Sequence, residues 1–428
     1  MNKQTAQPAL KLFLLTIFAL TSSCAPLTAV PSPTATPAPS QTPTATVTPS
    51  PTNTPEPIHP SGAVFYFANT AVYSVDLKNQ QVKTVIQLSP LSGYFIANNS
   101  IYTILFSKTS SFYEIFKISI DGSQSEQLTT GGIIDAFNTD PGGKYLTYSN
   151  GERVLEIFDI AAQTSEVIAK PSKDSEWVWA YSWSPDRTKL FYGKFVPDFD
   201  ICAPFIYDLN EKKSTAILPD KKVSCNAEWS PDGAFMAIAN DAGFYLWNTK
   251  ENSVRQVLLS PNYVMFDGFI WDTNGKNIFV STSEAIYRYE VNSGKLEEIS
   301  SYPDLDVPAT ASPDRKMILY EPINTDTTTD LYLLDLETKE TVKIHSHPAI
   351  LYYGKTVDTG PWDYSPAWSP DSKYFAYFTT PESTKDGAQR LFITIYEVQT
   401  GNSISFEVPP VNHAGFWKNT YWIYTTDL

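Results

Sequence analysis

Short apolar runs separated by turn residues fill the chain from residue 61 onward. In "AEWSPDGAFMAIAND", residues 227–241, Pro231, Asp232 and Gly233 stand between two such runs. Apolar runs of this length bounded by Pro, Gly, Asp or Asn indicate β-strands joined by tight turns. Similar corners recur along the chain at Asp140, Asp186, Asn274, Asp314 and Asp371.

A second pattern is an apolar strand that ends in a polar residue. It occurs eight times, with the polar residue at Asp76, Ser119, Asp159, Asp208, Asn248, Glu290, Asp335 and Glu397. Most intervals in both patterns are about 40 to 50 residues, which is the length of a four-stranded propeller blade. The sequence therefore predicts an all-β fold, a β-propeller of eight blades.

The two ends of the chain complement each other in this repeat. The last residues, "HAGFWKNTYWIYTTDL", have the pattern of the inner half of a blade, and the first strands after residue 60 that of an outer half. Pairing the N- and C-terminal strands would close the ring and remove exposed edges. Residues 64–68 and 421–425 both match the second strand, however, so a seven-bladed ring with an irregular terminal blade is the alternative.

The corner around Asp232 has the residues of a type I turn. Ser230, Pro231 and Gly233 occupy favoured positions of that turn, and the Asp232 carboxylate can accept hydrogen bonds from its own corner. We therefore expect Asp232 to be a structural residue and not a catalytic one. The same interpretation applies to Asp186, Asp314 and Asp371.

These repeats resemble those of TolB-type, WD-like β-propellers. The segments "WSPDG" and "AWSPDSKYFAY" carry the resemblance, and "YEIFKISIDGSQSEQLTTGG" at residues 113–132 matches the outer half of the repeat. The likeness spans residues 61–428 and implies the fold, not a function. TolB proteins have an α/β domain before the propeller, whereas a Pro/Thr-rich segment stands there in this chain, so a role in envelope translocation is not implied.

Composition narrows the set of partners. Aromatic residues make up 14% of the chain, as suits strands, and the formal net charge is −15. Nucleic acids and anionic membrane surfaces attract clusters of Lys and Arg, so we expect neither as a partner. We expect a monomer without a cofactor.

The first sixty residues indicate export. Lys3 and Lys11 flank a short apolar run, and "TSSCAP" resembles a bacterial lipoprotein signal in which Cys24 becomes the lipidated first residue. Thr21 departs from the usual aliphatic residue, and an ordinary secretory peptide is the alternative. We assign residues 1–23 to the signal peptide, 24–60 to the lipidated Cys and a disordered Pro/Thr/Ser-rich linker, and 61–428 to the propeller. The expected location is the cell surface or the periplasm.

The two other cysteines, Cys202 and Cys225, fall in neighbouring connections of the predicted blades. In a propeller, the loops between second and third strands and the connections between blades emerge on one face, which we call the loop face. An exported protein permits a disulfide between them, with two free thiols as the alternative.

A long insertion, residues 345–364, is expected on the same loop face. His345 and His347 lack a third ligand at a recognisable spacing, so we predict no metal site. Tyr352, Tyr353 and Trp362 are candidates for binding a ligand, because exposed aromatic side chains anchor sugars and protein partners. Packing of the insertion on its own blade is the alternative. In "SEWVWAYSW", aromatic residues alternate strictly, so at least two of them should be core residues: Trp177, Trp179, Tyr181 and Trp183.

Catalytic motifs are missing from the sequence. It contains no G-x-S-x-G elbow, no P-loop and no H-E-x-x-H helix. We therefore expect a cell-envelope binding or scaffold module for a protein or glycan partner. The rival is an enzyme acting on polysaccharide or peptide through carboxylates in the central funnel. Its candidate acids are Asp198, Asp200, Asp304, Asp306, Asp326 and Asp330.

Mass spectrometry of the purified protein tests both cysteine assignments. We expect a mature chain that begins at a lipid-modified Cys24 and gains two hydrogen atoms on reduction, as opening of a Cys202–Cys225 disulfide requires. A chain that carries no lipid, or whose mass reduction leaves unchanged, would contradict the corresponding assignment.

Overall fold

The chain divides into two units, Met1–Thr54 and Pro55–Leu428, and every residue described below belongs to the second. The computed structural model describes residues 58–68, 71–88, 94–173, 176–196, 201–218, 223, 226–240, 243–258, 266–282, 285–301, 305–325, 328–348, 366–379, 391–409 and 421–423. These residues form strands and turns and no helix. None of them forms a helix long and apolar enough to cross a membrane.

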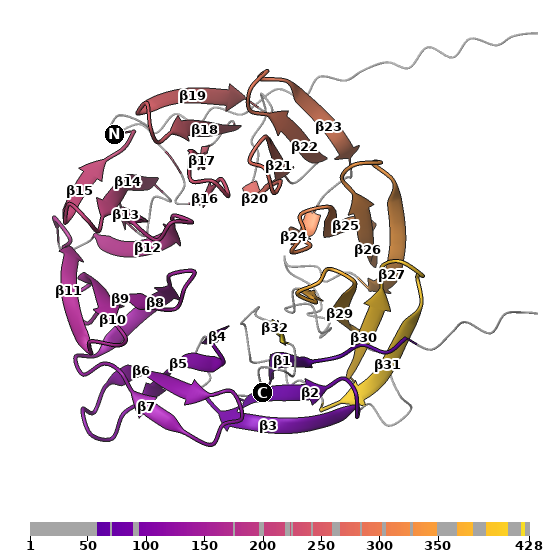
Figure 1. Ribbon diagram of the computed structural model, residues 1–428, viewed down its shortest axis with the longest axis horizontal. Coiled ribbons are helices and arrows are strands. Elements are labelled where there is room, and N and C mark those ends of the chain that lie inside the picture. The colour runs from indigo at the N-terminus through magenta and orange to yellow at the C-terminus, as the bar shows by residue number, and fades with distance from the viewer. Residues whose placement is uncertain are drawn as a thin grey trace, which may run out of the picture. The chain divides into compact units, whose positions relative to one another are not determined.

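The strands form eight antiparallel four-stranded sheets, the blades, arranged in a ring around a centre (Figure 1). From the innermost to the outermost strand, blade 1 is β32 (Tyr421–Ile423), β1 (Ala63–Ala68), β2 (Ala71–Asp76) and β3 (Gln81–Gln87). Blade 2 is β4 (Tyr94–Ala97), β5 (Ser100–Phe106), β6 (Tyr113–Ser119) and β7 (Ser125–Gln127). Blade 3 is β8 (Ile133–Thr139), β9 (Tyr145–Asn150), β10 (Leu155–Asp159) and β11 (Thr164–Ala169). Blade 4 is β12 (Trp177–Trp183), β13 (Lys189–Val196), β14 (Ile201–Asp208) and β15 (Lys213–Ala216).

The other four blades have the same order. Blade 5 is β16 (Ala227–Trp229), β17 (Phe235–Asn240), β18 (Gly243–Asn248) and β19 (Ser253–Leu258). Blade 6 is β20 (Phe266–Trp271), β21 (Asn277–Thr282), β22 (Ala285–Glu290) and β23 (Leu296–Ser301). Blade 7 is β24 (Leu305–Ala311), β25 (Met317–Thr325), β26 (Thr328–Asp335) and β27 (Thr341–Pro348). Blade 8 is β28 (Ala367–Trp368), β29 (Tyr374–Thr379), β30 (Leu391–Glu397) and β31 (Ser403–Val408).

The eight polar residues of the second sequence pattern are the last residues of the eight third strands. At Asp76, for example, Oδ1 accepts hydrogen bonds from the N–H groups of Lys78 (2.9 Å) and Asn79 (3.1 Å), and Asp159 closes its turn in the same way. The carboxylate thus satisfies the backbone donors of the turn to the outermost strand. Eight blades are confirmed, and the seven-bladed alternative is wrong.

The ring closes by pairing its two ends, as predicted. Strand β32 pairs with β1 in an antiparallel register that sets Phe65 opposite Tyr421 and Ala63 opposite Ile423. The predicted number of strands that each end contributes to this blade was wrong, however. Three strands of blade 1 come from the N-terminal segment, and the described C-terminal residues contribute one innermost strand. Residues 64–68 are therefore the second strand, and 421–423 are not.

The corner at Asp232 is held by its own side chains, as predicted. Ser230 Oγ donates to Asp232 Oδ1 (2.6 Å) and accepts from the N–H of Phe235 (2.9 Å), while the N–H of Gly233 donates to Ser230 O (2.8 Å). Gly233 has a φ of 69°, which glycine adopts without strain. Ser184–Asp186, Ser312–Asp314 and Ser369–Asp371 repeat the same hydroxyl–carboxylate bond.

The alignment of one corner was wrong by two residues. The N–H of Asp140 donates to Tyr145 O (3.1 Å), just as the N–H of Ser230 donates to Phe235 O (2.8 Å). Asp140 therefore occupies the position of Ser230 and not that of Asp232. The buried Asp140 carboxylate does the work of both the Ser230 hydroxyl and the Asp232 carboxylate. It accepts hydrogen bonds from the N–H groups of Gly142 (3.0 Å), Lys144 and Tyr145 (both 2.6 Å).

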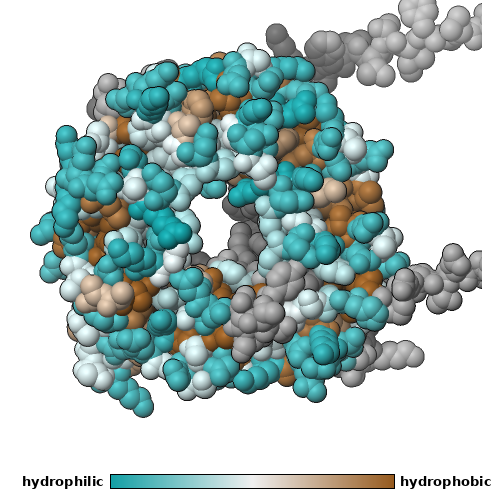
Figure 2. All heavy atoms as spheres, in the orientation of Figure 1, coloured by the Kyte–Doolittle hydropathy of each residue, from teal (hydrophilic) through white to brown (hydrophobic). Residues whose placement is uncertain are grey.

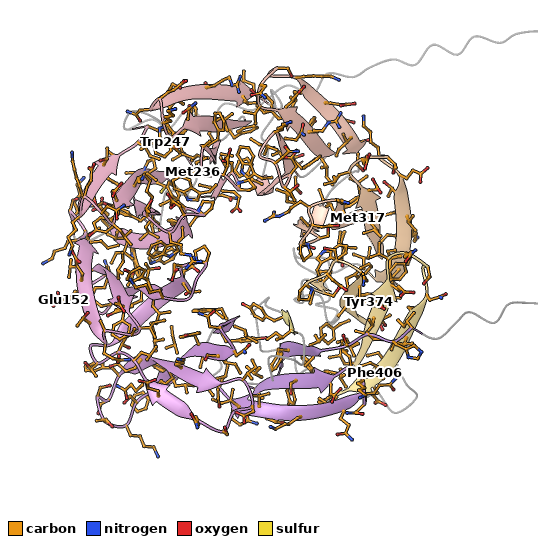
Figure 3. All side chains as sticks on the ribbon, viewed as in Figure 1. Glu152, Met236, Trp247, Met317, Tyr374 and Phe406 are labelled. Carbon is orange, nitrogen blue, oxygen red and sulfur yellow. The ribbon has the colours of Figure 1, made fainter. Side chains whose placement is uncertain are left out.

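Apolar side chains fill the spaces between neighbouring blades. Between blades 4 and 5, Phe191 meets Met236 and Trp247, and all three are buried. Figure 3 shows Met236 and Trp247 on the side of blade 5 that faces blade 4. Burial of a large apolar side chain contributes roughly 1.5–3 kcal/mol, so these inter-blade layers dominate the stability of the ring.

Replacement of Ser230 by Ala tests the corner. Because the variant leaves the buried N–H of Phe235 without its acceptor, we expect a loss of about 1–3 kcal/mol in the free energy of unfolding, measured by chemical denaturation. The exposed Ser253 is the matched control, and Ser253→Ala should change stability by less than about 0.5 kcal/mol. Equal stability of the two variants would show that the corner bond is not structural.

Candidate functional site

Several predicted site residues lie outside the described part of the chain: Cys24, Cys225, Tyr352, Tyr353 and Trp362. Cys202 is described. It is buried in β14, it is disulfide-bonded, and its N–H donates to Val223 O (3.1 Å), two residues before Cys225. The pairing of Cys202 with Cys225 stays a prediction.

The histidines of the expected insertion belong to a strand. His345 and His347 lie in β27, where His345 faces Leu331 and His347 faces Thr329 of β26. The His345 ring lies 5.8 Å from the ring of Tyr377 in blade 8. The predicted start of the insertion at residue 345 was therefore too early, because β27, the outermost strand of blade 7, continues to Pro348.

The aromatic alternation of β12 is interrupted by a bulge. The register against β13 shifts between Ala180 and Ser182, so Tyr181 has no direct partner and the strand changes face there. Trp183 consequently enters the core between blades 3 and 4 and stacks on Tyr145 at 6.0 Å. Trp177 and Trp179, before the bulge, stay on the other face of the strand and are half-buried.

Trp177 and Trp179 form one end of an aromatic cluster on the loop face. The guanidinium carbon of Arg153, in the β9–β10 turn, lies 4.6 Å from the centre of the Trp177 ring. The Trp177 and Trp179 rings are 5.9 Å apart, and Trp179 meets Phe195 of β13 edge to face at 4.5 Å. A cation over an indole ring and an edge-to-face pair each hold the rings in place.

A second aromatic group belongs to the β5–β6 hairpin of blade 2. Phe106, Phe112 and Tyr113 are exposed by 54%, 58% and 41%, and they are large apolar side chains open to solvent. The Phe106 and Tyr113 rings meet edge to face at 5.6 Å. Between them the loop has the sequence Ser-Lys-Thr-Ser-Ser-Phe, in which Ser107 Oγ bonds Gln127 (2.7 Å). Exposed large apolar side chains gathered in one hairpin are typical of interaction surfaces.

Glycines join the two aromatic groups. A Cβ on Gly132 would lie 3.4 Å from Phe112 Cγ, and Gly132 O accepts from the N–H of Gly151 (3.1 Å), which is two residues before Arg153. A Cβ on Gly131 would meet nothing within 4 Å. Between the aromatic groups, Gly131 and Gly151 are therefore exposed backbone, while Phe112 lies against the buried Gly132. We call the whole feature the aromatic strip: Phe106, Phe112, Tyr113, Gly131, Gly132, Gly151, Arg153, Trp177, Trp179 and Phe195.

A buried carboxylate fixes the backbone of Gly131 and Gly132. Glu114 of β6 is fully buried, and its Oε1 accepts from the N–H of Gly132 (3.1 Å). Its Oε2 accepts from Thr129 Oγ1 (2.8 Å) and the N–H of Gly131 (3.3 Å). Because every oxygen has a backbone or hydroxyl donor, Glu114 serves the connection between blades 2 and 3 and is not available for chemistry.

The aromatic strip was missed by the sequence analysis. Its residues come from three blades, in a hairpin loop, two glycine-containing connections and the first half of β12. Figure 3 shows Glu152, a neighbour of Arg153 in the β9–β10 turn, at the outer edge of the ring. The signal that was present is the run "FSKTSSFY" at residues 106–113, whose aromatic residues flank a Ser/Thr loop.

The centre of the ring is open in Figure 2, with hydrophilic residues over much of the visible face. Among the innermost strands, Glu228 of β16 is the one carboxylate whose side chain is described. Burial raises the pKa of Glu228, and the positive charge of Arg315 in the blade 7 corner opposes that rise. The described residues contain no group of three His, Cys, Asp or Glu side chains able to hold a metal ion.

The predicted acids of the funnel are only partly described. Asp330 lies in the third strand of blade 7, not the innermost, and its carboxylate contacts Lys343 Nζ at 2.7 Å. Burial raises its pKa, but the hydrogen bonds from Lys343, Ser346 and Tyr332 outweigh burial and lower it overall. Asp330 is thus a paired structural acid. The remaining candidates have side chains outside the described part: Asp198, Asp200, Asp304, Asp306 and Asp326.

Solved structures share the fold at low sequence identity. The dihydro-heme d1 dehydrogenase NirN is 12% identical, with 86% of this chain and 80% of that one covered at a TM-score of 0.57. Dipeptidyl peptidase 4 of Porphyromonas gingivalis is 11% identical, with 82% and 58% covered at 0.55. An oligogalacturonate lyase solved with manganese is 15% identical, with 80% and 97% covered at 0.51. No protein-family model and no curated protein matches the chain.

This chain is an eight-bladed β-propeller. Identities of 11% to 15% establish the fold alone, and the three proteins are named for different reactions. The function must therefore be argued from the surface of this propeller.

Glu228→Gln tests the acid at the centre of the ring. A carboxyl whose pKa rises on folding stabilises the fold at low pH, and that stability is lost as the pH rises through the folded-state pKa. We therefore expect the neutral variant to be more stable than the parent at pH 7 and equally stable below roughly pH 4, the ordinary carboxyl value. Denaturation midpoints across this range check it, with exposed Glu152→Gln as the control that changes nothing. Equal stability of Glu228→Gln and parent at pH 7 would contradict the burial effect.

Proposed function

We propose that this chain is an exported binding protein whose loop face takes a protein or glycan partner through the aromatic strip. The strip itself is the observation that supports this proposal. It combines three exposed rings, a cation stacked on an indole and the exposed glycines Gly131 and Gly151, and it crosses three blades. We further propose that a lipid on Cys24 and a Pro/Thr-rich linker anchor the monomeric propeller at the bacterial cell surface or in the periplasm.

The chemistry of the strip suits recognition of an extended ligand. Trp, Tyr and Arg are the residues that most often dominate binding energy, because they bury large rigid surfaces at little entropic cost. Glycines without a Cβ allow the backbone of a ligand, or the face of a sugar, to approach closely. Tyr352, Tyr353 and Trp362 are proposed to extend the same loop-face surface.

An enzyme acting through the centre of the ring is the second candidate. The observation in its favour is Glu228, a partly buried carboxyl of raised pKa on an innermost strand. Cleavage of a glycosidic bond uses two carboxyl groups in defined positions, and the described innermost strands offer one. The binding function has the larger set of observations behind it.

A binding screen followed by variants tests the proposed function. The purified protein is first applied to a glycan array and to envelope extracts, and the ligand found is then titrated by calorimetry. We expect Phe112→Ser and Trp177→Ala each to weaken binding by at least about tenfold, as loss of an anchoring aromatic residue does.

Two further variants separate binding from folding. Leu258 is exposed by 63% on the outermost strand of blade 5, so Leu258→Ser removes an equally open apolar group away from the strip and should leave affinity unchanged. Gly131→Leu places a side chain in open space between the aromatic groups and should block the ligand without lowering the melting temperature. Unchanged affinity in Phe112→Ser, Trp177→Ala and Gly131→Leu would refute the strip as the site.

A further inference from the structure

Neighbouring blades are tied at their outer edges by one repeated polar contact. In each contact, a residue of one blade's outermost strand meets the turn that precedes the outermost strand of the next blade. Lys83 of β3 donates through Nζ to Asp121 O in the turn before β7 (3.0 Å). Glu166 Oε2 of β11 lies 2.7 Å from Lys212 Nζ in the turn before β15. Gln163 and Glu126 form the same contact at 3.4 Å. Each of these ties uses one donor and one acceptor.

At the polar contact between blades 6 and 7, the cationic side chains outnumber the carboxylate that they surround. Glu297 of β23 pairs with Lys339 from the blade 7 turn, as the repeat requires, but it also pairs with Arg288 of β22. Lys295 Nζ lies 3.8 Å from Glu297 Oε2, beyond hydrogen-bonding distance. Hydrogen bonds from Lys339 and Arg288 lower the pKa of Glu297 to about 2, so this carboxylate stays ionised. One carboxylate therefore faces three cations.

Arg288 occupies a position that is apolar in five of the other seven blades and is Ser74 and Lys117 in the remaining two. It stands two residues before the end of a third strand, and the equivalent residue is a buried aliphatic one in five of the other blades: Ile157, Ile206, Leu246, Leu333 and Ile395. Each of these packs in the layer against the following blade. An arginine at this position places charge where those blades have apolar filling, and a cavity adjoins it.

That space is a polar cavity of about 210 Å³, lined by Asn277, Arg288, Glu290, Lys295 and Glu297. The remaining lining groups also have partners outside the cavity. Glu290 accepts from Ser293 Oγ (2.6 Å), and Asn277 Nδ2 donates to Asp272 (2.7 Å). With Lys339, three cations meet two carboxylates, an excess of positive charge in a chain whose formal net charge is −15.

We propose that the cavity between blades 6 and 7 is a binding site for an oxyanion, either a tetrahedral sulfate or phosphate or a carboxylate group. The planar guanidinium of Arg288 presents several N–H donors, of which Nη2 serves Glu297. The ammonium group of Lys295 adds donors from the open side, where its side chain is 65% exposed. The hydrogen bond to Glu297 aligns the Arg288 guanidinium, so its donors are positioned before an anion arrives. This site is separate from the aromatic strip and does not depend on the proposed function.

Thermal unfolding of the full protein tests the site. Sodium sulfate, phosphate and glucuronate are titrated against sodium chloride at equal ionic strength, and Arg288→Leu is the key variant. Because Leu333 fills the equivalent position in blade 7, Arg288→Leu should fold. We expect a saturable rise in the parent's melting temperature with at least one of the three anions, and its loss in Arg288→Leu. Any general salting effect of sulfate is common to both proteins and cancels in the comparison.

Two more variants make the test specific. Lys295→Gln keeps the tie between blades and should raise the apparent dissociation constant at least tenfold. Lys212→Gln removes the equivalent cation between blades 3 and 4 and should leave the anion response unchanged. A response to sulfate and phosphate alone identifies a tetrahedral oxyanion, and a response to glucuronate alone identifies a carboxylate ligand. An equal response in parent and Arg288→Leu, or none above chloride in the parent, would overturn the site.

Discussion

Every blade of this propeller has two apolar faces, and neither is covered until another blade packs against it. Strand β17 shows the constraint within six residues, since Met236 and Ile238 are buried against blade 4 while Ala237 and Ala239 are buried in the layer with blade 6. A row of such sheets leaves an apolar face at each end unless it closes on itself. The pairing of β32 with β1 supplies that closure and joins the two ends of the chain in one blade.

The two faces of the closed ring differ in how their turns are bonded. On one face, the corners are short and bonded internally, and neighbouring corners also touch: Asn98 Nδ2 donates to Gly142 O (2.8 Å), and the N–H of Asp314 donates to Ser372 Oγ (3.0 Å). These turns are occupied by the construction of the ring. The loop face has the longest connections between strands, and the aromatic strip lies there.

Repetition also shows where a blade departs from the majority. Arg288 stands where five other blades have a buried aliphatic side chain, and a charged cavity takes the place of apolar filling. A ring of eight nearly equivalent layers can tolerate one such exchange, because the remaining layers still bury their apolar faces. Comparison of blades within one chain thus separates residues that build the fold from residues added to it.

Local patterns in the sequence determined the blades. The eight strand-ending residues and the Ser-Pro-Asp corners were predictable, because each acts on backbone groups within a few residues of itself. The bulge at Tyr181 was not, since alternation in sequence cannot reveal a residue inserted against β13, and the role of Asp140 emerged only from its hydrogen bonds to the N–H groups of Lys144 and Tyr145. The aromatic strip and the cavity at Arg288 were decided by tertiary structure alone. The cavity is lined by residues from three strands of blade 6 and the turn between two of them, and the strip comes from three consecutive blades, so only strand pairing and blade packing bring these residues together.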